Sequence, residues 1–133
     1  MILRQHVKAH QLGEVFIAPV DVVLDQENVV QPDLVFVSAA HAGLLERRGI
    51  MGAPDLVVEV ISPGSLRRDR YEKRELYARF GVREFWLADV ANRSLEVLTL
   101  QDGAYHLSSF ASGTGKIASA LLSGLELDLS QLD

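Results

Sequence analysis

Three side chains in this sequence have types and surroundings that suit the hydrolysis of a phosphate ester. Glu59 lies among valines and an isoleucine in residues 55–61, an apolar run that predicts a buried strand. A carboxylate in such a strand is costly unless it is paired or holds a metal ion. Asp33 begins a second apolar run, and Lys73 follows in a helical pattern. These three residues form a site only if the fold brings them together.

A neighbouring strand must supply the partner of Glu59. Asp55 shares a face of the strand with Glu59, but four residues at about 3.3 Å each separate them by roughly 13 Å. If the strand that follows Asp33 runs antiparallel, Asp33 lies beside Glu59, because neighbouring strands are about 4.8 Å apart. A parallel strand would bring Asp33 beside Asp55 and leave Glu59 alone. The antiparallel arrangement explains the buried glutamate, and we therefore predict it.

The helix predicted after the Glu59 strand, over about residues 66–80, supplies a cation. At 100° per residue, Lys73 falls within the arc that faces the sheet. The arc consists of Leu66, Asp69, Lys73, Leu76, Tyr77 and Phe80. We expect the stem of Lys73 to be buried there, with its ammonium group within about 4 Å of Glu59 in the metal-free protein. The alternative is a lysine that extends out of this face into solvent.

Two carboxylates and a lysine in one place make a set that can cleave a phosphodiester. Asp33 and Glu59 are predicted to bind Mg²⁺ or Mn²⁺, which polarises the phosphate and activates a water molecule. Lys73 is the predicted catalytic cation, which stabilises developing charge or holds the water.

The elements that position these residues follow from the remaining pattern. An apolar helical repeat starts at Met1 and ends at Gly13. The predicted order continues with strand pieces in residues 14–24, a strand at 31–37, a helix at 39–48, a strand at 55–61, a helix at 66–80, a strand at 84–89, a hairpin over 95–110 and an extended tail. This order indicates a mixed α/β or α+β domain.

Composition bounds the class of protein. The chain has 133 residues, which suits a single domain. It contains no cysteine, no apolar run long enough for a membrane span and no signal peptide, which fits the cytoplasm. The formal net charge of −5 disfavours broad electrostatic capture of nucleic acid, although a nuclease site is itself acidic.

Four blocks of sequence carry a family resemblance: Gln31–Val37, Ala53–Pro63, Arg68–Tyr77 and Gly81–Asp89. In their order and spacing, the chain resembles the Uma-type (Uma-two) family of restriction-endonuclease-like proteins, in the PD-(D/E)XK nuclease superfamily. The resemblance covers nearly the whole chain. It implies an α-β-β-β-α-β core with a mixed sheet and a C-terminal β-hairpin extension, and metal-dependent cleavage of DNA.

The same resemblance exposes two departures. The superfamily's lysine stands two residues after the glutamate, where this chain has Ile61, so Lys73 would be the replacement on the helix. Compared with the family, residues 1–133 are expected to form a single domain that is truncated at its N-terminus. An uncovered apolar face or sheet edge then predicts a homodimer. The rival hypothesis is a non-catalytic interaction or assembly domain that keeps the nuclease fold.

Two further acids have open roles. Asp55 would hold a second metal ion or position the Asp33 strand, but a role in the turn that starts its own strand is the more common one. Asp69, one turn before Lys73, would orient that lysine or cap the helix.

Overall fold

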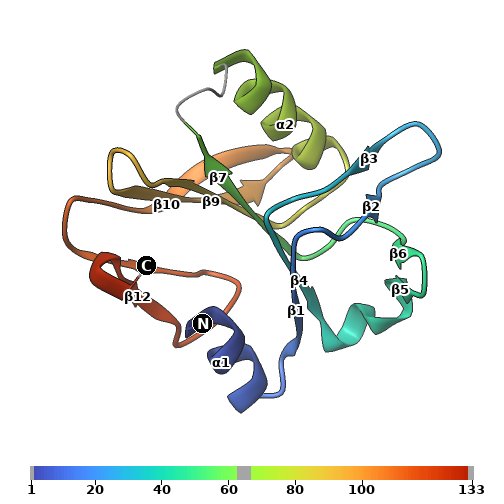
Figure 1. Ribbon diagram of the computed structural model, residues 1–133, viewed down its shortest axis with the longest axis horizontal. Helices are drawn as coiled ribbons and strands as arrows, with labels where there is room; N and C mark the ends of the chain where they lie inside the picture. The colour runs from blue at the N-terminus through green and yellow to red at the C-terminus, as the bar shows by residue number, and fades with distance from the viewer. Residues whose placement is uncertain (1, 63–66, 132–133) are drawn as a thin grey trace.

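A six-stranded mixed sheet forms the centre of the protein (Figure 1). The computed structural model describes residues 2–62 and 67–131. The strand order is β1 (Gly13–Ile17), β4 (Leu34–Ser38), β7 (Leu56–Ile61), β8 (Glu84–Asp89), β9 (Ser94–Gln101) and β10 (Ala104–Ser112). Strands β7 and β8 run parallel, whereas the other neighbouring pairs in this sheet run antiparallel. The predicted mixed sheet and its C-terminal hairpin, β9 and β10, are confirmed.

The pairing of β4 with β7 determines where the acids lie. The two strands are antiparallel, with Leu34 opposite Val58. One step beyond that pair, the register brings Asp33 next to Glu59, as the buried glutamate predicted.

Helix α2 (Arg67–Arg79) covers one face of the sheet on the crossover from β7 to β8 (Figure 1). Its Tyr77 is fully buried and packs edge-on against Phe85, with ring centroids 5.2 Å apart. The chain then turns at Gly81, whose φ of +82° suits a glycine that ends a helix. This packing fixes the side of α2 that faces Glu59.

The opposite face is covered by the two ends of the chain. Helix α1 (Ile2–Ala9) buries Leu3 and Val7 against the sheet. A two-stranded sheet of β11 (Lys116–Ala118) and β12 (Glu126–Asp128) and the 3₁₀ helix η2 (Leu129–Gln131) complete this layer. In the described residues, no helix is long and apolar enough to cross a membrane.

The helix predicted for residues 39–48 begins at the predicted residue but is shorter. A short 3₁₀ helix, η1 (Ala39–Leu44), is followed by strands β5 (Leu45–Glu46) and β6 (Gly49–Ile50). These join β2 (Val22–Val23) and β3 (Val29–Val30) in a second sheet of order β3-β2-β6-β5. The helix ends at Leu44 because Leu45 and Glu46 pair with Ile50 and Gly49 in an antiparallel hairpin. At Gly49 the φ is +145°, and a Cβ there would lie 2.5 Å from the Asp21 carbonyl oxygen. Strand pairing therefore overrides the helix propensity of the second half of the segment.

Candidate active site

Glu59 is a buried carboxylate, and in the described part of the chain only one of its oxygens has partners. It projects from β7 towards α2 and is 7% exposed. Its Oε2 accepts a hydrogen bond from the Tyr77 hydroxyl at 2.7 Å and lies 3.3 Å from the Lys73 Nζ. Burial raises the pKa of Glu59, and the Tyr77 hydrogen bond and the Lys73 charge offset part of this rise. Tyr77 and Lys73 therefore hold the Glu59 carboxylate in place, but they do not fully offset the effect of burial on its pKa.

Lys73 makes the expected contact but lies at the rim of the site. The 3.3 Å distance to Glu59 falls within the range predicted for the metal-free protein. Its side chain is 46% exposed, so Lys73 is half-exposed as a whole. Tyr77, one turn further along α2, is fully buried above β7. A half-exposed lysine side chain can contact both Glu59 and a ligand from solvent.

Asp33 is held by the main chain of the neighbouring strand. Its Oδ2 accepts a hydrogen bond of 2.7 Å from the Val60 amide. The Asp33 charge also contributes to the raised pKa of Glu59, behind burial as the main cause, which agrees with their adjacent positions in the sheet. The second oxygen of each acid, Asp33 Oδ1 and Glu59 Oε1, has no hydrogen bond within the described part of the chain.

Both acids and the lysine line one pocket of about 520 Å³. Its other walls come from the end of β7, from β8, from α2 and from the segment before β4: Gln31, Val60, Ile61, Ser62, Arg70, Glu72, Leu76, Phe85 and Leu87. No group of three or more His, Cys, Asp or Glu side chains with metal-binding geometry occurs in residues 2–62 and 67–131. Two carboxylates with one unbonded oxygen each fit a hard cation that takes its remaining ligands from water and phosphate, as Mg²⁺ does.

Comparisons with known proteins identify the family and the fold. A family model named Uma2, with the description "Putative restriction endonuclease", matches residues 1–130. The chain belongs to the Uma2 family. The crystal structure of a nuclease described as putative and as belonging to DUF820, from Anabaena variabilis, has a similar fold, with a TM-score of 0.73 and 16% sequence identity. The match covers 97% of this chain and 72% of that chain, and at this identity it shows the fold alone. No curated protein matches.

Membership of the Uma2 family confirms the resemblance drawn from the four sequence blocks, and the neighbour confirms the fold class. The family and fold are those of restriction-endonuclease-like nucleases. The catalytic and metal-binding roles of individual residues stay predictions.

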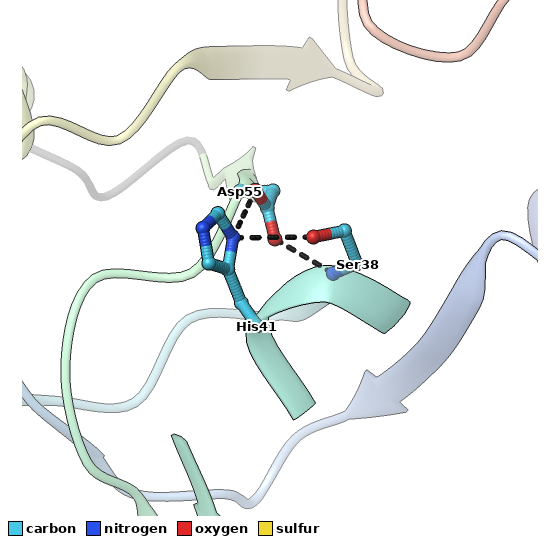
Figure 2. A network of polar contacts seen from close by, with 3 residues as sticks. All are labelled: Ser38, His41 and Asp55. Carbon is cyan, nitrogen blue, oxygen red and sulfur yellow. Dashed lines mark hydrogen bonds and ion pairs between the residues drawn. The ribbon is translucent and has the colours of Figure 1, made fainter. Parts of the chain in front are cut away.

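Asp55 lies at the start of β7 and has a structural position in this Uma2 fold (Figure 2). Its Oδ2 accepts the Ser38 amide at 2.6 Å, and its Oδ1 lies 2.8 Å from the His41 Nδ1. The Ser38 hydroxyl contacts the same nitrogen at 3.1 Å, so the three side chains do not form a relay of the serine-protease type. Asp55 joins the end of β4 to η1, in keeping with the expected role at the start of its strand. Asp69 lies on α2, but its side chain is outside the described residues.

Sequence reasoning missed two polar partners. No role is predicted from the sequence for the Tyr77 hydroxyl, although its position four residues after Lys73 on the same arc is a usable signal. No role is predicted for Glu84 either, yet this residue is 1% exposed and accepts hydrogen bonds from Trp86, Ser119 and Leu121. Two of those donors, Ser119 and Leu121, come from the C-terminal segment, so the residues near Glu84 in the sequence do not predict these hydrogen bonds.

Proposed function

We propose that the protein is a metal-dependent endonuclease that hydrolyses DNA phosphodiester bonds. One observation carries the proposal: a buried glutamate with an unbonded oxygen stands next to Asp33 and 3.3 Å from Lys73, in an open pocket. In the described residues Arg70 Nε is the one enclosed polar side-chain atom without a partner, so the unbonded oxygen of Glu59 is not enclosed and is open to a cation in the pocket. The Uma2 family and the fold support nuclease chemistry at this place.

In this proposal each residue has a separate task. Asp33 and Glu59 would hold Mg²⁺ or Mn²⁺, which supplies charge stabilisation for the phosphate and a more acidic bound water. Tyr77 orients the Glu59 carboxylate through its hydroxyl. Lys73 would stabilise the negative charge that develops on the phosphate, because its side chain is half-exposed and lines the pocket.

Metal binding and DNA nicking test the acid pair together. Titration with Mn²⁺ should reveal one weak site that Asp33→Ala and Glu59→Ala each remove, and plasmid nicking in Mg²⁺ or Mn²⁺ should be lost in both variants. Asp102→Asn is the matched control, because Asp102 is exposed in the turn between β9 and β10. Unchanged Mn²⁺ binding in either alanine variant would refute the assignment.

Lys73 should separate catalysis from metal binding. Lys73→Ala is expected to abolish nicking while Mn²⁺ binding stays within about threefold of wild type, because the lysine acts on the phosphate or water. Lys73→Arg should restore little activity, since a planar guanidinium group does not replace a compact ammonium. Lys8→Ala, on the opposite layer of the protein, serves as the control. A Lys73→Ala variant with full activity would remove the lysine from the mechanism.

A second candidate, an assembly domain without catalysis, is favoured by the free edge of the main sheet. Strand β10 is the last strand in the order, and its Leu107 and Phe110 are 56% and 51% exposed. Leu107 pairs with Leu98 of β9, and Phe110 pairs with Glu96. Since these partners are two residues apart, the β-bulge between Leu107 and Ser109 places the side chains of Leu107 and Phe110 on the same face of the sheet. Such an edge strand favours pairing with a second copy.

The homodimer that this edge supports is tested by sedimentation. Wild-type protein should associate at micromolar concentration, and a Leu107→Ser, Phe110→Ser double variant should be monomeric. Val29→Ser, at a residue 54% exposed on β3, removes a comparable apolar side chain elsewhere. A wild-type monomer across this range refutes the dimer. A dimer that never nicks DNA would favour the assembly domain over the nuclease.

A further inference from the structure

Arg70 is the second cation of the pocket. It lies three residues before Lys73 on α2, so the two side chains are on the same side of the helix. Both line the pocket that contains Asp33 and Glu59. Arg70 is half-buried, and its Nε is enclosed by the protein.

The guanidinium group of Arg70 has unused donors. Its buried Nε has no hydrogen-bond acceptor, and no other hydrogen bond or ion pair of Arg70 occurs in the described part of the chain. The pKa of Asp89 is lowered first by hydrogen bonds from Asn92, and the Arg70 charge makes only a smaller contribution. Asp89 therefore accepts its hydrogen bonds from Asn92 and is not a hydrogen-bond acceptor for Arg70.

Helix stability does not explain this arginine either. Arg70 is in the first turn of α2, where the helix dipole favours acidic side chains and disfavours cations. Arg74, one turn later, differs because its Nη2 donates to the Tyr105 carbonyl at 3.1 Å and so ties α2 to β10. An arginine that is half-buried, lacks an acceptor and faces an open pocket is typical of a group that awaits an anion.

We infer that Arg70 is a phosphate-binding residue, which holds a backbone phosphate of the nucleic acid beside the Asp33 and Glu59 pair. The planar guanidinium group presents paired donors that match two phosphate oxygens, whereas Lys73 offers a single charged point. The inference rests on the proposed nuclease function for the identity of its ligand. It adds a second cation that contacts the substrate and, like Lys73, takes no part in binding the metal.

Binding of a fluorescein-labelled 12-base-pair DNA duplex in EDTA tests Arg70 without any cleavage. Arg70→Met should weaken binding about tenfold, Arg70→Lys should recover part of the loss, and inorganic pyrophosphate should compete less well against the Met variant. The control is Arg79→Met, which removes an exposed arginine near the other end of the same helix. It should change the affinity less than threefold.

Thermal unfolding distinguishes a ligand-binding role from a structural one. Because Met fills the same space and removes a buried donor without a partner, Arg70→Met should unfold at the same or a higher temperature. A lower unfolding temperature, equal losses of affinity in the Arg70 and Arg79 variants, or no measurable DNA binding by wild type would overturn the inference.

The nicking assay keeps this inference apart from the proposed function. If wild type binds the duplex through Arg70 but never nicks a plasmid, the nuclease proposal fails and the phosphate-binding residue stands. If wild type nicks and Arg70→Met does so with an unchanged KM, the nuclease proposal stands and the inference fails.

Discussion

Glu59 and Glu84 are both buried on neighbouring strands of one sheet, yet their surroundings differ. On the α2 face, Glu59 has its two polar contacts, from Tyr77 and Lys73, on the same oxygen. On the opposite face, Glu84 uses both oxygens: Oε1 accepts Trp86 Nε1 and the Ser119 hydroxyl at 2.6 Å each, and Oε2 accepts the Leu121 amide at 2.9 Å. Glu59 opens onto a pocket, whereas Glu84 is enclosed by the C-terminal segment.

The difference separates a buried acid that the protein satisfies by itself from one that it leaves open to a ligand. Burial alone does not separate them, since both are at most 7% exposed. What separates them is whether the protein satisfies every acceptor itself. Glu84 needs no ligand, and it ties the C-terminal segment to β8. Within the described part of the chain, Glu59 has one oxygen without a hydrogen bond, in a residue that lines a pocket.

The largest effect is expected from Glu84→Ala. This change leaves the Trp86, Ser119 and Leu121 donors without an acceptor and opens a cavity, so the free energy of unfolding should fall by about 3 kcal/mol. Urea denaturation measures this loss, with Glu14→Ala on the exposed side of β1 as the control. A loss below about 1 kcal/mol would mean that the hydrogen bonds of Glu84 do not stabilise the fold as this comparison requires.

A medium effect is expected from Asp55→Asn, which places a third buried acid in the comparison. Both Asp55 oxygens have donors, Ser38 and His41, so it should behave like Glu84. We expect a loss of about 1–2 kcal/mol in unfolding free energy, because the amide nitrogen replaces one acceptor. Mn²⁺ binding should not change. Weaker binding of Mn²⁺ by this variant would mean that Asp55 contributes to the metal site, and the contrast between hydrogen-bonded acids and Glu59 would not hold.

The smallest effect, and one of opposite sign, is expected from Glu59→Gln. Burial raises the pKa of Glu59 above its ordinary value of 4.5, so between 4.5 and its folded pKa the folded state binds more protons than the unfolded state. The free energy of unfolding of wild type therefore falls as pH rises through this window. Glutamine does not titrate, and its carbonyl can still accept the Tyr77 hydroxyl.

Glu59→Gln should accordingly gain stability relative to wild type as pH increases, by roughly 1 kcal/mol or less at neutral pH in EDTA. Urea denaturation at pH 4 and pH 7 measures the change. A variant that is less stable than wild type at pH 7 would show that the Glu59 charge stabilises the metal-free fold, and the contrast with Glu84 would lose its basis.

The acid pair was predictable from the sequence because both signals are local and the geometry of a sheet is regular. A glutamate within an apolar run requires a partner. Antiparallel pairing with the apolar strand that precedes it in the sequence makes Asp33 the candidate. The position of Lys73 followed from helical periodicity, but its exposure did not, because periodicity gives a direction and not the height of a side chain above the sheet.

The remaining features depend on contacts between distant parts of the chain. The predicted helix of residues 39–48 ends early because Leu45 pairs with Ile50, which in turn pairs with Val22. Glu84 meets Ser119 and Leu121 across more than thirty positions of sequence. No window of sequence contains such a pair, so no local pattern could have revealed it.

Because the Val60 amide donates a hydrogen bond to Asp33, the chemical shift of this backbone proton depends on the state of the Asp33 carboxylate. Val60 lies two residues beyond Val58, the last β7 residue that pairs with β4. Its amide therefore donates to a side-chain carboxylate and not to a main-chain carbonyl of β4. A cation that draws electron density from the Asp33 carboxylate must alter the shielding of that proton. In a nitrogen–proton correlation spectrum, the Val60 resonance would therefore move during a Mg²⁺ titration, and it would report occupancy of the site without substrate or turnover.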